Sequence, residues 1–144
     1  MKVGVDYIGV GCGAIVINEK DEVLLLRRST TSRTDPGKWC RPGGQVEFGE
    51  SVAAAVERET KEEAGIVVRA IRPLEFTDDR SEDMSKHWIA LGYLAEHVSG
   101  EPVNVEPDKH DTIGWFPLDQ LPENLATYTK NSIDVYLDQK RYGL

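Results

Sequence analysis

The sequence contains little cysteine and few basic residues. Cys12 and Cys40 are its only cysteines, and they lie far apart without the spacing of metal ligands. This excludes a disulfide framework, and both residues are expected to be free thiols. The 17 lysines and arginines are outnumbered by 25 acidic residues, which gives a net charge of −8. Binding a nucleic acid polymer requires clustered basic residues, so this class of partner is excluded as well.

Long apolar runs are also missing. No segment reaches the roughly 18 consecutive apolar residues of a membrane-spanning helix. Asp6 interrupts the apolar N-terminal stretch, and the glycines between Gly9 and Gly13 alternate as in a strand rather than in a signal peptide. We therefore expect no membrane partner and a cytoplasmic location. The length of 144 residues predicts one domain over residues 1–144.

Strands and helices follow one another in a regular order. A turn at residues 18–21 joins two predicted strands into a hairpin, and further strands precede and follow a central helix. The predicted strands are 7–18, 22–28, 67–77, 86–97 and 113–117, with the short segment 39–42 leading into a glycine-rich loop, and the predicted helices are 52–64 and 125–142. This order favours an α/β fold with a mixed sheet between helices.

The central helix carries a cluster of acidic side chains. Ser51 is a suitable N-cap, and Gly65 can supply the left-handed residue that ends the helix. Glu59, Glu62 and Glu63 stand at i, i+3 and i+4, so they share one face with about 5–6 Å between Cβ atoms. Their mutual repulsion would be relieved by a hard cation such as Mg²⁺ or Mn²⁺. The alternative interpretation is an ordinary solvated helix face.

The segment ahead of the helix favours the metal-binding interpretation. Pro42, Gly43 and Gly44 predict a sharp backbone turn, which would expose a carbonyl oxygen near the carboxylates. A solvated helix face does not require a glycine pair at this position.

The run at residues 44–66, GQVEFGESVAAAVERETKEEAGI, resembles the signature of the Nudix hydrolases, G-x5-E-x7-R-E-U-x-E-E-x-G-U, where U is a bulky aliphatic residue. Thr60 is the sole departure from it. The matching residues are Gly44, Glu50, Arg58, Glu59, Glu62, Glu63, Gly65 and Ile66. The resemblance implies the Nudix α/β/α sandwich with a mixed sheet between helices. It also implies Mg²⁺-dependent cleavage of a nucleoside diphosphate linked to another moiety, with Mn²⁺ as a substitute.

The resemblance further implies roles for the residues of the signature. Gly44 would lend its carbonyl oxygen to the metal, and Glu62 and Glu63 would be metal ligands. Glu59 would serve either as a metal ligand or as the general base for the attacking water, and the sequence leaves both roles open.

Other residues would support the site or bind the substrate. By the resemblance, Glu50 and Arg58 form an ion pair that holds the loop onto the helix. Arg27 and Arg28 end the second predicted strand, where the family often places an arginine near the substrate phosphates. Strand alternation points them to opposite faces, so only one would bind substrate. Trp39 is a candidate either for base stacking or for the core.

A second resemblance concerns the substrate. Residues 101–117, EPVNVEPDKHDTIGWFP, together with residues 86–89, look like the corresponding region of MutT-type Nudix enzymes. These enzymes hydrolyse free nucleoside triphosphates, including oxidised ones, to a nucleoside monophosphate and pyrophosphate. Glu106 is then a candidate for an additional catalytic carboxylate, with Asp108 and Asp111 as alternatives and a solvated loop as the structural interpretation. A homodimer is common in the family.

Two other functions remain open at this stage. The same site could cleave ADP-ribose or a nucleotide sugar. A Nudix-like domain could also bind a nucleotide as a sensor without catalysis. Such sensors generally lose carboxylates of the signature, and Glu59, Glu62 and Glu63 are all present here, so the sequence favours an enzyme acting on a small nucleotide.

Overall fold

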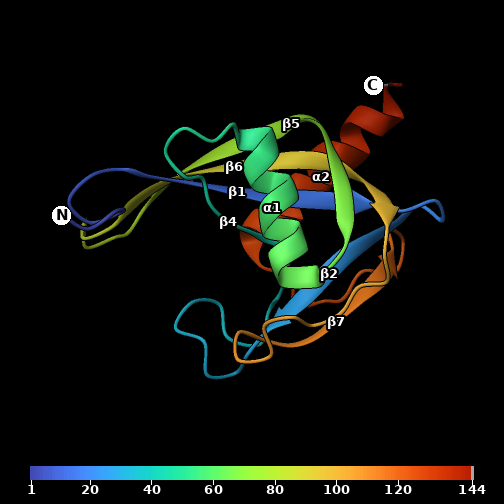
Figure 1. Cartoon of the computed structure of the whole chain (residues 1–144), viewed down its shortest axis with the longest axis horizontal. Helices are drawn as coiled ribbons and strands as arrows, with labels where there is room; N and C mark the ends of the chain where they lie inside the picture. The colour runs from blue at the N-terminus through green and yellow to red at the C-terminus, as the bar shows by residue number, and fades with distance from the viewer. Residues whose placement is uncertain (144) are drawn as a thin grey trace.

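The computed structural model of the chain describes residues 1–143, which form a seven-stranded sheet with a helix on each face (Figure 1). The strands are β1 (Gly9–Ile17), β2 (Glu22–Arg28), β3 (Trp39–Cys40), β4 (Gly43–Gln45), β5 (Val67–Arg80), β6 (His87–Ser99) and β7 (His110–Pro117), and the helices are α1 (Val52–Ala64) and α2 (Thr127–Arg141). The strand order is β3-β2-β1-β6-β5, with β4 paired to β1 and β7 paired to β2. Only β1 and β6 run parallel, so the sheet is mixed, as predicted.

The first two strands form the predicted hairpin but remain paired only near its turn. Ile17 lies opposite Val23, and the next part of β1 pairs with β4 instead, with Cys12 opposite Gly44. β2 pairs along its length with β7. As a result β1 and β2 diverge from the turn onward, which Figure 1 shows plainly. This divergence leaves room between the two strands at the end that carries Gly11 and Arg28.

Alternation along the strands divides the core into two layers. Ala14, Val16 and Leu24 pack with α1, whereas Ile15 and Leu25 belong to the cluster that includes α2. All five are fully buried. Removing a large aliphatic side chain from water contributes about 1.5–3 kcal/mol, so both faces of the sheet favour a covering helix. The predicted α/β/α sandwich is confirmed.

Helix α1 has the predicted bounds because both of its ends are capped. Ser51 Oγ accepts a hydrogen bond from the Ala54 N–H at 3.1 Å, and Gly65 adopts the left-handed conformation with φ of 69°. Thr60, the departure from the signature, is fully buried and donates its hydroxyl to the Val56 carbonyl at 2.8 Å. Its polar group is therefore satisfied within the helix, and the position keeps its packing role.

Helix α2 begins at Thr127 rather than at the predicted residue 125. Leu125 forms a β-bridge with Trp39, and the Ala126 N–H donates to the Trp39 carbonyl at 2.8 Å. These contacts hold the two residues in extended conformation and delay the helix. Neither helix among residues 1–143 has the length and hydropathy needed to cross a membrane.

Strands β5 and β6 extend beyond the predicted ends and form a long arm. They pair from Val67 opposite Ser99 to Arg80 opposite His87. The N-terminal segment lies beside the tip of the arm (Figure 1), where the His87 N–H donates to the Gly4 carbonyl at 2.8 Å. Both faces of the arm are largely solvent-exposed near its tip, so the sequence there has no apolar alternation from which a strand could be predicted.

The sharp turn expected at the glycine pair is absent, and this prediction was wrong. Gly43 and Gly44 lie in β4, and neither has a positive φ. The glycines are required by close approach instead. A Cβ atom on Gly43 would collide with the carbonyl oxygen of Cys12, and one on Gly44 would collide with the Glu59 carboxylate. Any larger residue would separate β4 from β1 or displace Glu59 from the strand.

Gly43→Ala is expected to destabilise the protein by about 1–3 kcal/mol, the usual cost of forcing an extra methyl group into a packed position. In thermal unfolding followed by circular dichroism, this corresponds to a decrease in Tm of several degrees. Gly114→Ala is the matched control, because Gly114 also lies in a strand and its nearest neighbour to an added Cβ is Phe116 at 3.9 Å. Equal Tm values for the two variants would contradict the close-approach explanation.

Candidate active site

A cavity of about 390 Å³ lies where β1 and β2 diverge. It brings together segments that are distant in the sequence, from β1, the glycine pair, α1, the arm, β7 and α2. Its lining includes Gly44, Glu63, Arg28, Arg41, Trp88 and His110. The volume falls within the range of roughly 300–1,000 Å³ that is typical of sites for small ligands.

Glu63 is the acidic residue most deeply placed in this cavity, with only 7% of its surface exposed. Its Oε1 accepts a hydrogen bond from the Gly43 N–H at 2.6 Å, and its Oε2 lies 3.5 Å from His110 Nε2. Burial, together with the nearby charges of Glu106 and Glu59, raises the pKa of Glu63 to about 8. The negative charge of the carboxylate is therefore not compensated by its surroundings, so binding of either a proton or a cation is favoured.

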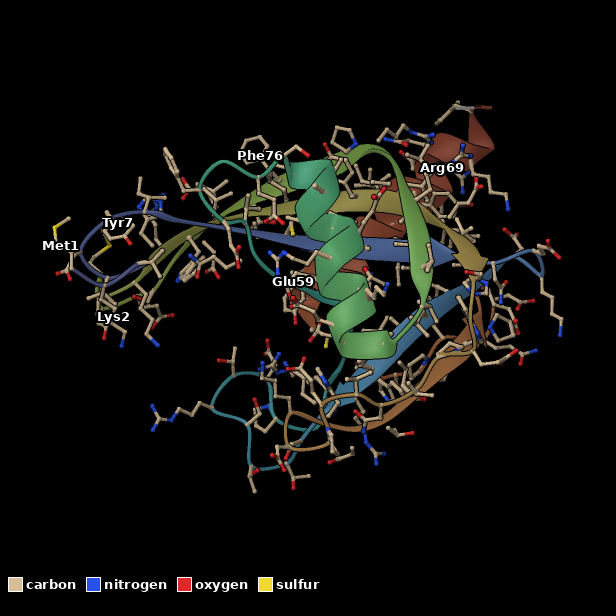
Figure 2. The ribbon with its side chains drawn as sticks, in the orientation of Figure 1. Met1, Lys2, Tyr7, Glu59, Arg69 and Phe76 are labelled. Carbon is tan, nitrogen blue, oxygen red and sulfur yellow. The ribbon has the colours of Figure 1, made fainter. Side chains whose placement is uncertain are left out.

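Glu59 lies against the glycine pair, since a Cβ atom on Gly44 would occupy the position of its carboxylate. Figure 2 shows Glu59 beside α1, on the side toward which β1 and β2 diverge. Burial and the charges of Glu62 and Glu106 raise the pKa of Glu59, while a hydrogen bond from Arg58 opposes this increase. Glu106 thus acts electrostatically on both helix carboxylates from a distant loop.

Arg58 joins the loop to the helix, as the resemblance implied. Its guanidinium binds Glu50 in a bidentate manner, with Nε 2.7 Å from Oε2 and Nη2 2.9 Å from Oε1. Nη2 also donates to the Gln45 carbonyl at 3.0 Å. The hydrogen bonds from Arg58 lower the pKa of Glu50 to about 2. Two charge-assisted bonds in one plane fix the loop with geometric precision.

Arg58 also binds two of the carboxylates predicted as metal ligands. Its Nη1 lies 2.9 Å from Glu59 Oε1 and 3.3 Å from Glu62 Oε2. The Glu62 side chain is 55% exposed and is not part of the cavity lining. The three glutamates therefore share the site unequally, with Glu63 inside, Glu59 at its edge and Glu62 in solvent.

The three acidic candidates near the start of β7 differ in position, since Glu106 and Asp108 precede the strand and Asp111 lies in it. Glu106 contributes to the raised pKa values of Glu59 and Glu63, and its own carboxylate lies 3.1 Å from Lys109 Nζ. Asp111 forms an ion pair with Arg27 at 3.5 Å. The Asp108 side chain makes no hydrogen bond or ion pair within residues 1–143. Of the three, Glu106 alone is among the charges that raise the pKa values of both Glu59 and Glu63.

The two arginines that end β2 point to opposite sides, as alternation predicted. Arg28 lines the cavity, where its Nε donates to the Thr34 carbonyl at 2.7 Å. Arg27 lies over the ring of Trp39 at 5.7 Å, and that ring packs edge-on against Phe116 at 4.8 Å. Neither Arg27 nor Trp39 lines the cavity. The structure thus does not bring Arg27 and Trp39 to the candidate site. Alternate residues of a strand point to opposite faces of the sheet, and these two side chains lie on the face away from the cavity.

Sequence reasoning missed His110 and Arg41. His110 is 3% exposed, and its Nδ1 has no hydrogen-bond partner in the described part of the chain. Burial and the charge of Arg28 lower the pKa of His110, so it stays neutral beside Glu63. Arg41 is 6% exposed and lines the same cavity. The only signal for Arg41 was a charged residue directly before the Pro-Gly-Gly segment, and His110 had none.

No ready-made cluster of three or more His, Cys, Asp or Glu side chains suited to a metal ion is found within residues 1–143. Arg58 explains this arrangement, because it holds Glu59 and Glu62 by ion pairs. The chemistry of the donors nevertheless fits a hard divalent cation. Glu63 is buried with a raised pKa, and its acidic neighbours carry the oxygen atoms that such an ion would require as ligands. A cation would supply the missing positive charge.

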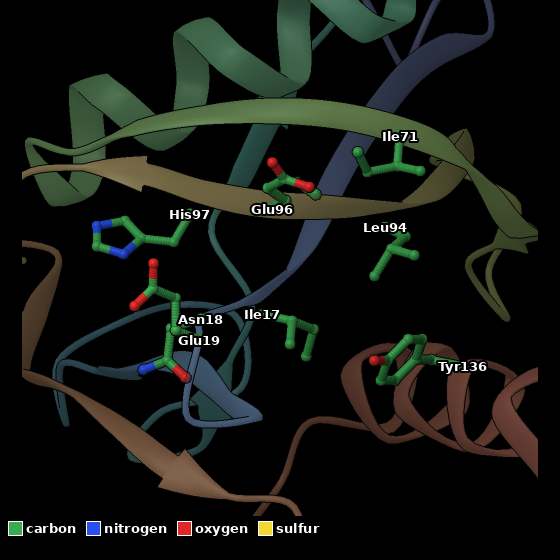
Figure 3. Close-up of a pocket in the computed structure, with 9 residues that line it drawn as sticks. Ile17, Asn18, Glu19, Ile71, Leu94, Glu96, His97 and Tyr136 are labelled. Carbon is green, nitrogen blue, oxygen red and sulfur yellow. The ribbon is translucent and has the colours of Figure 1, made fainter.

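A second cavity, of about 400 Å³, lies between the turn that joins β1 and β2, strands β5 and β6, and α2 (Figure 3). Ile17, Leu94 and Tyr136 form its apolar side, and His97 lies near the turn. None of its lining residues comes from the signature segment 44–66. Of these two cavities, only the first is lined by the signature segment, through Gly44, Gln45 and Glu63.

Comparison with known proteins identifies relatives that are named for two different activities. The chain is 38% identical over 128 residues to the NAD-capped RNA hydrolase NudC of Pseudomonas aeruginosa, which covers 88% of the chain and 43% of that protein. It is 31% identical over 117 residues to the 8-oxo-dGDP phosphatase NUDT18 of Mus musculus, which covers 80% and 34%, respectively. The chain spans less than half the length of these curated relatives.

A solved structure and a domain family agree with this similarity. The MutT NUDIX hydrolase from Burkholderia pseudomallei superposes with a TM-score of 0.79 at 40% identity, over 90% of this chain and 98% of that one. The NUDIX domain family matches residues 8–138, which include the sheet, the signature helix and most of α2. With Glu63 and the glycine pair of the signature lining one cavity and Glu59 lying against Gly44, the chain belongs to the Nudix family.

Proposed function

We propose that the protein is a divalent-cation-dependent pyrophosphohydrolase that converts nucleoside triphosphates, including modified ones, to a nucleoside monophosphate and pyrophosphate. The observation that carries this proposal is the buried Glu63, which lines a nucleotide-sized cavity and whose pKa is raised by burial and by the nearby charges of Glu106 and Glu59. The net charge of −8 supports a small nucleotide rather than a polymer as the substrate.

The acidic residues would hold the cation. Glu63 and Glu59 are the first candidates, with Glu62, Glu106 and the Gly44 carbonyl completing the set. Mg²⁺ is the expected ion, and Mn²⁺ accepts the same oxygen ligands. When bound, such an ion would neutralise phosphate charge and lower the pKa of water.

The remaining steps belong to side chains of the chain itself. Glu59 is the first candidate to accept the proton of the attacking water, because burial makes its carboxylate more basic than an exposed one. Glu106 is the alternative base. Arg28 lines the cavity and would bind phosphate oxygens of the substrate. No cysteine or serine is assigned as a nucleophile. Burial raises the pKa of Cys12 and of Cys40 to about 11, so both thiols stay protonated and weakly nucleophilic.

A second candidate function is cleavage of the pyrophosphate in a dinucleotide or nucleotide sugar, such as ADP-ribose. The 38% identity to a protein named as an NAD-capped RNA hydrolase favours it, since NAD is itself a dinucleotide pyrophosphate. The 40% identity and the near-complete mutual coverage with a MutT structure favour the triphosphates.

Product release from a substrate panel tests the proposal. Canonical and 8-oxo triphosphates, ADP-ribose, NAD and a nucleotide sugar are incubated with Mg²⁺, with Mn²⁺ and with chelator. Pyrophosphate should be released from triphosphates only when a metal is present. The Glu63→Gln variant, purified in the same way, controls for contaminating phosphatases. Turnover of ADP-ribose or NAD alone would select the second candidate, and no turnover of any substrate would point to a nucleotide-binding sensor.

A further inference from the structure

Arg41 combines deep burial with access to the candidate active site. Its side chain is only 4% exposed, and it lies between the sheet and the beginning of α2. It nevertheless lines the same cavity as Glu63. A buried guanidinium is costly unless its donors are matched, so the distribution of its hydrogen bonds indicates its role.

One nitrogen of the guanidinium makes all of its side-chain hydrogen bonds. Arg41 Nη1 lies 3.3 Å from Glu75 Oε1 and 3.3 Å from the Tyr128 carbonyl, and it also contacts Ser132 Oγ. The ring of Tyr128 lies 5.2 Å from the centre of the guanidinium. These contacts hold the planar group in one orientation.

The other two nitrogens are unmatched. Arg41 Nε and Nη2 make no hydrogen bond within residues 1–143, and neither is among the polar atoms sealed from solvent. In a guanidinium these two nitrogens carry parallel N–H bonds, which form a two-pronged donor. The protein thus hydrogen-bonds only one edge of the guanidinium. The donor pair formed by Nε and Nη2, the fork, remains available to a molecule in the cavity.

The surrounding sequence makes room for this side chain. A Cβ atom on Gly13 would collide with Arg41 Nε, and one on Gly92 would meet Nη1 at 3.0 Å. Glycines on two adjacent parallel strands, opposite each other in register, are therefore needed to place the guanidinium on the sheet. This arrangement is specific to a large planar group and would leave a void around a smaller residue.

The ligand must offer two adjacent acceptors. Glu75 already neutralises the charge of Arg41, and Asp79 adds a further acidic group to the cavity, so a neutral acceptor pair fits better than a phosphate. The O6 and N7 atoms of guanine form such a pair, and arginine binds them in a bidentate manner. Adenine presents an amino group in place of O6, which would oppose the donors of the fork.

We propose that Arg41 reads the nucleobase, and that its Nε and Nη2 bind the O6 and N7 atoms of a 6-oxopurine nucleotide. This inference rests on the proposed function, because the signature carboxylates would act on the phosphates of the same nucleotide. Arg41 is then a specificity-determining residue. It contributes to base preference and leaves the chemistry of phosphate cleavage to the acidic cluster.

Arg41→Lys tests the proposal, because it retains the charge beside Glu75 but removes the fork. We expect kcat/KM for dGTP to fall about 10–100-fold and kcat/KM for dATP and dCTP to change by less than about threefold, in line with the value of one bidentate base contact. Arg72→Lys is the matched control, since Arg72 binds Gln139 of α2 at 3.0 Å and does not line the cavity. An equal loss for all bases would overturn the proposal and assign the fork to phosphate.

A probe on the substrate side does not depend on the folding of any variant. In 7-deaza-dGTP a carbon replaces N7, whereas dITP retains both O6 and N7. The wild-type protein should turn over 7-deaza-dGTP about tenfold less efficiently than dGTP, and dITP about as well as dGTP. Equal turnover of dGTP and 7-deaza-dGTP would overturn the proposal.

If no triphosphate is hydrolysed, the proposed function fails and the base-reading role is still tested. Calorimetry with dGMP, 7-deaza-dGMP and dAMP then measures binding to the wild-type protein directly. Tighter binding of dGMP than of the other two would support the role of Arg41 without catalysis. Equal binding of the three, or no binding of any, would overturn it.

Discussion

Glu63→Gln is expected to lower kcat/KM for every substrate by about 10³-fold or more, while the protein remains folded. The substitution removes the charge of the most deeply buried acidic residue in the cavity. Loss of that carboxylate would weaken the hold on a divalent cation, whose charge stabilisation is worth several kcal/mol. About 4 kcal/mol corresponds to a factor of 10³ in rate.

The geometry favours a folded variant. Glutamine has nearly the same volume as glutamate, and its amide oxygen can still accept the hydrogen bond from the Gly43 N–H. Initial rates of pyrophosphate release, with circular dichroism as a check of folding, measure the effect. Glu123→Gln removes the same charge at an exposed position that has no hydrogen bond or ion pair from its side chain in residues 1–143. A folded Glu63→Gln protein with activity within about threefold of wild type would contradict the assigned role.

The signature helix was predictable because all of its determinants are local. Ser51 and Gly65 set its ends, and the spacing of the carboxylates follows from the helical repeat. The same repeat could not show how far each carboxylate enters the site. Glu63 is buried by the approach of Gly43 and His110, whereas Glu62 has no such neighbours and stays exposed.

Long-range pairing accounts for most of what the sequence did not reveal. β4 exists because Gly43 and Gly44 approach β1, and no local pattern distinguishes this from a turn. The cavity exists because β1 and β2 separate after one residue pair. It was predictable that Arg27 and Arg28 point to opposite faces of the sheet. Which of the two faces the cavity depends on this separation of β1 and β2.

The buried polar residues of the cavity illustrate the same limit. Arg41 can be buried only because Glu75 and Ser132 meet it from β5 and α2, which lie far away in the sequence. Glycines at positions 13 and 92 also take part in this arrangement, although in the sequence they are typical of any strand with a close neighbour. Local sequence patterns therefore cannot predict this buried arginine, because its surroundings come from four separate segments of the chain.

The metal-free protein is expected to lose stability as the pH rises toward 8, and Glu63 is the reason. Its pKa is raised from 4.5 to about 8 in the folded state. Between these two values the folded protein retains a proton that the unfolded chain releases, so the free energy of unfolding falls with increasing pH. The shift corresponds to roughly 2–4 kcal/mol at pH 8, because one pKa unit is about 1.4 kcal/mol and partial relaxation reduces the full value.

Glu63→Gln should remove this decrease, because the amide does not titrate. At pH 8 in the presence of chelator, the variant is expected to have a Tm about 5–10 °C higher than the wild-type protein, and at pH 5 the two should be similar. His110 has a lowered pKa and opposes the trend below about pH 6.5, but it is neutral at pH 8 and does not contribute to the difference between the two proteins there. Millimolar Mg²⁺ at pH 8 should raise the Tm of the wild-type protein and leave the variant nearly unchanged, since a ligand stabilises only the state that binds it.

A wild-type protein that is equally stable at pH 5 and pH 8 in chelator would show that the Glu63 carboxylate is already compensated by its protein neighbours. In that case the cavity would not need a cation to balance its charge.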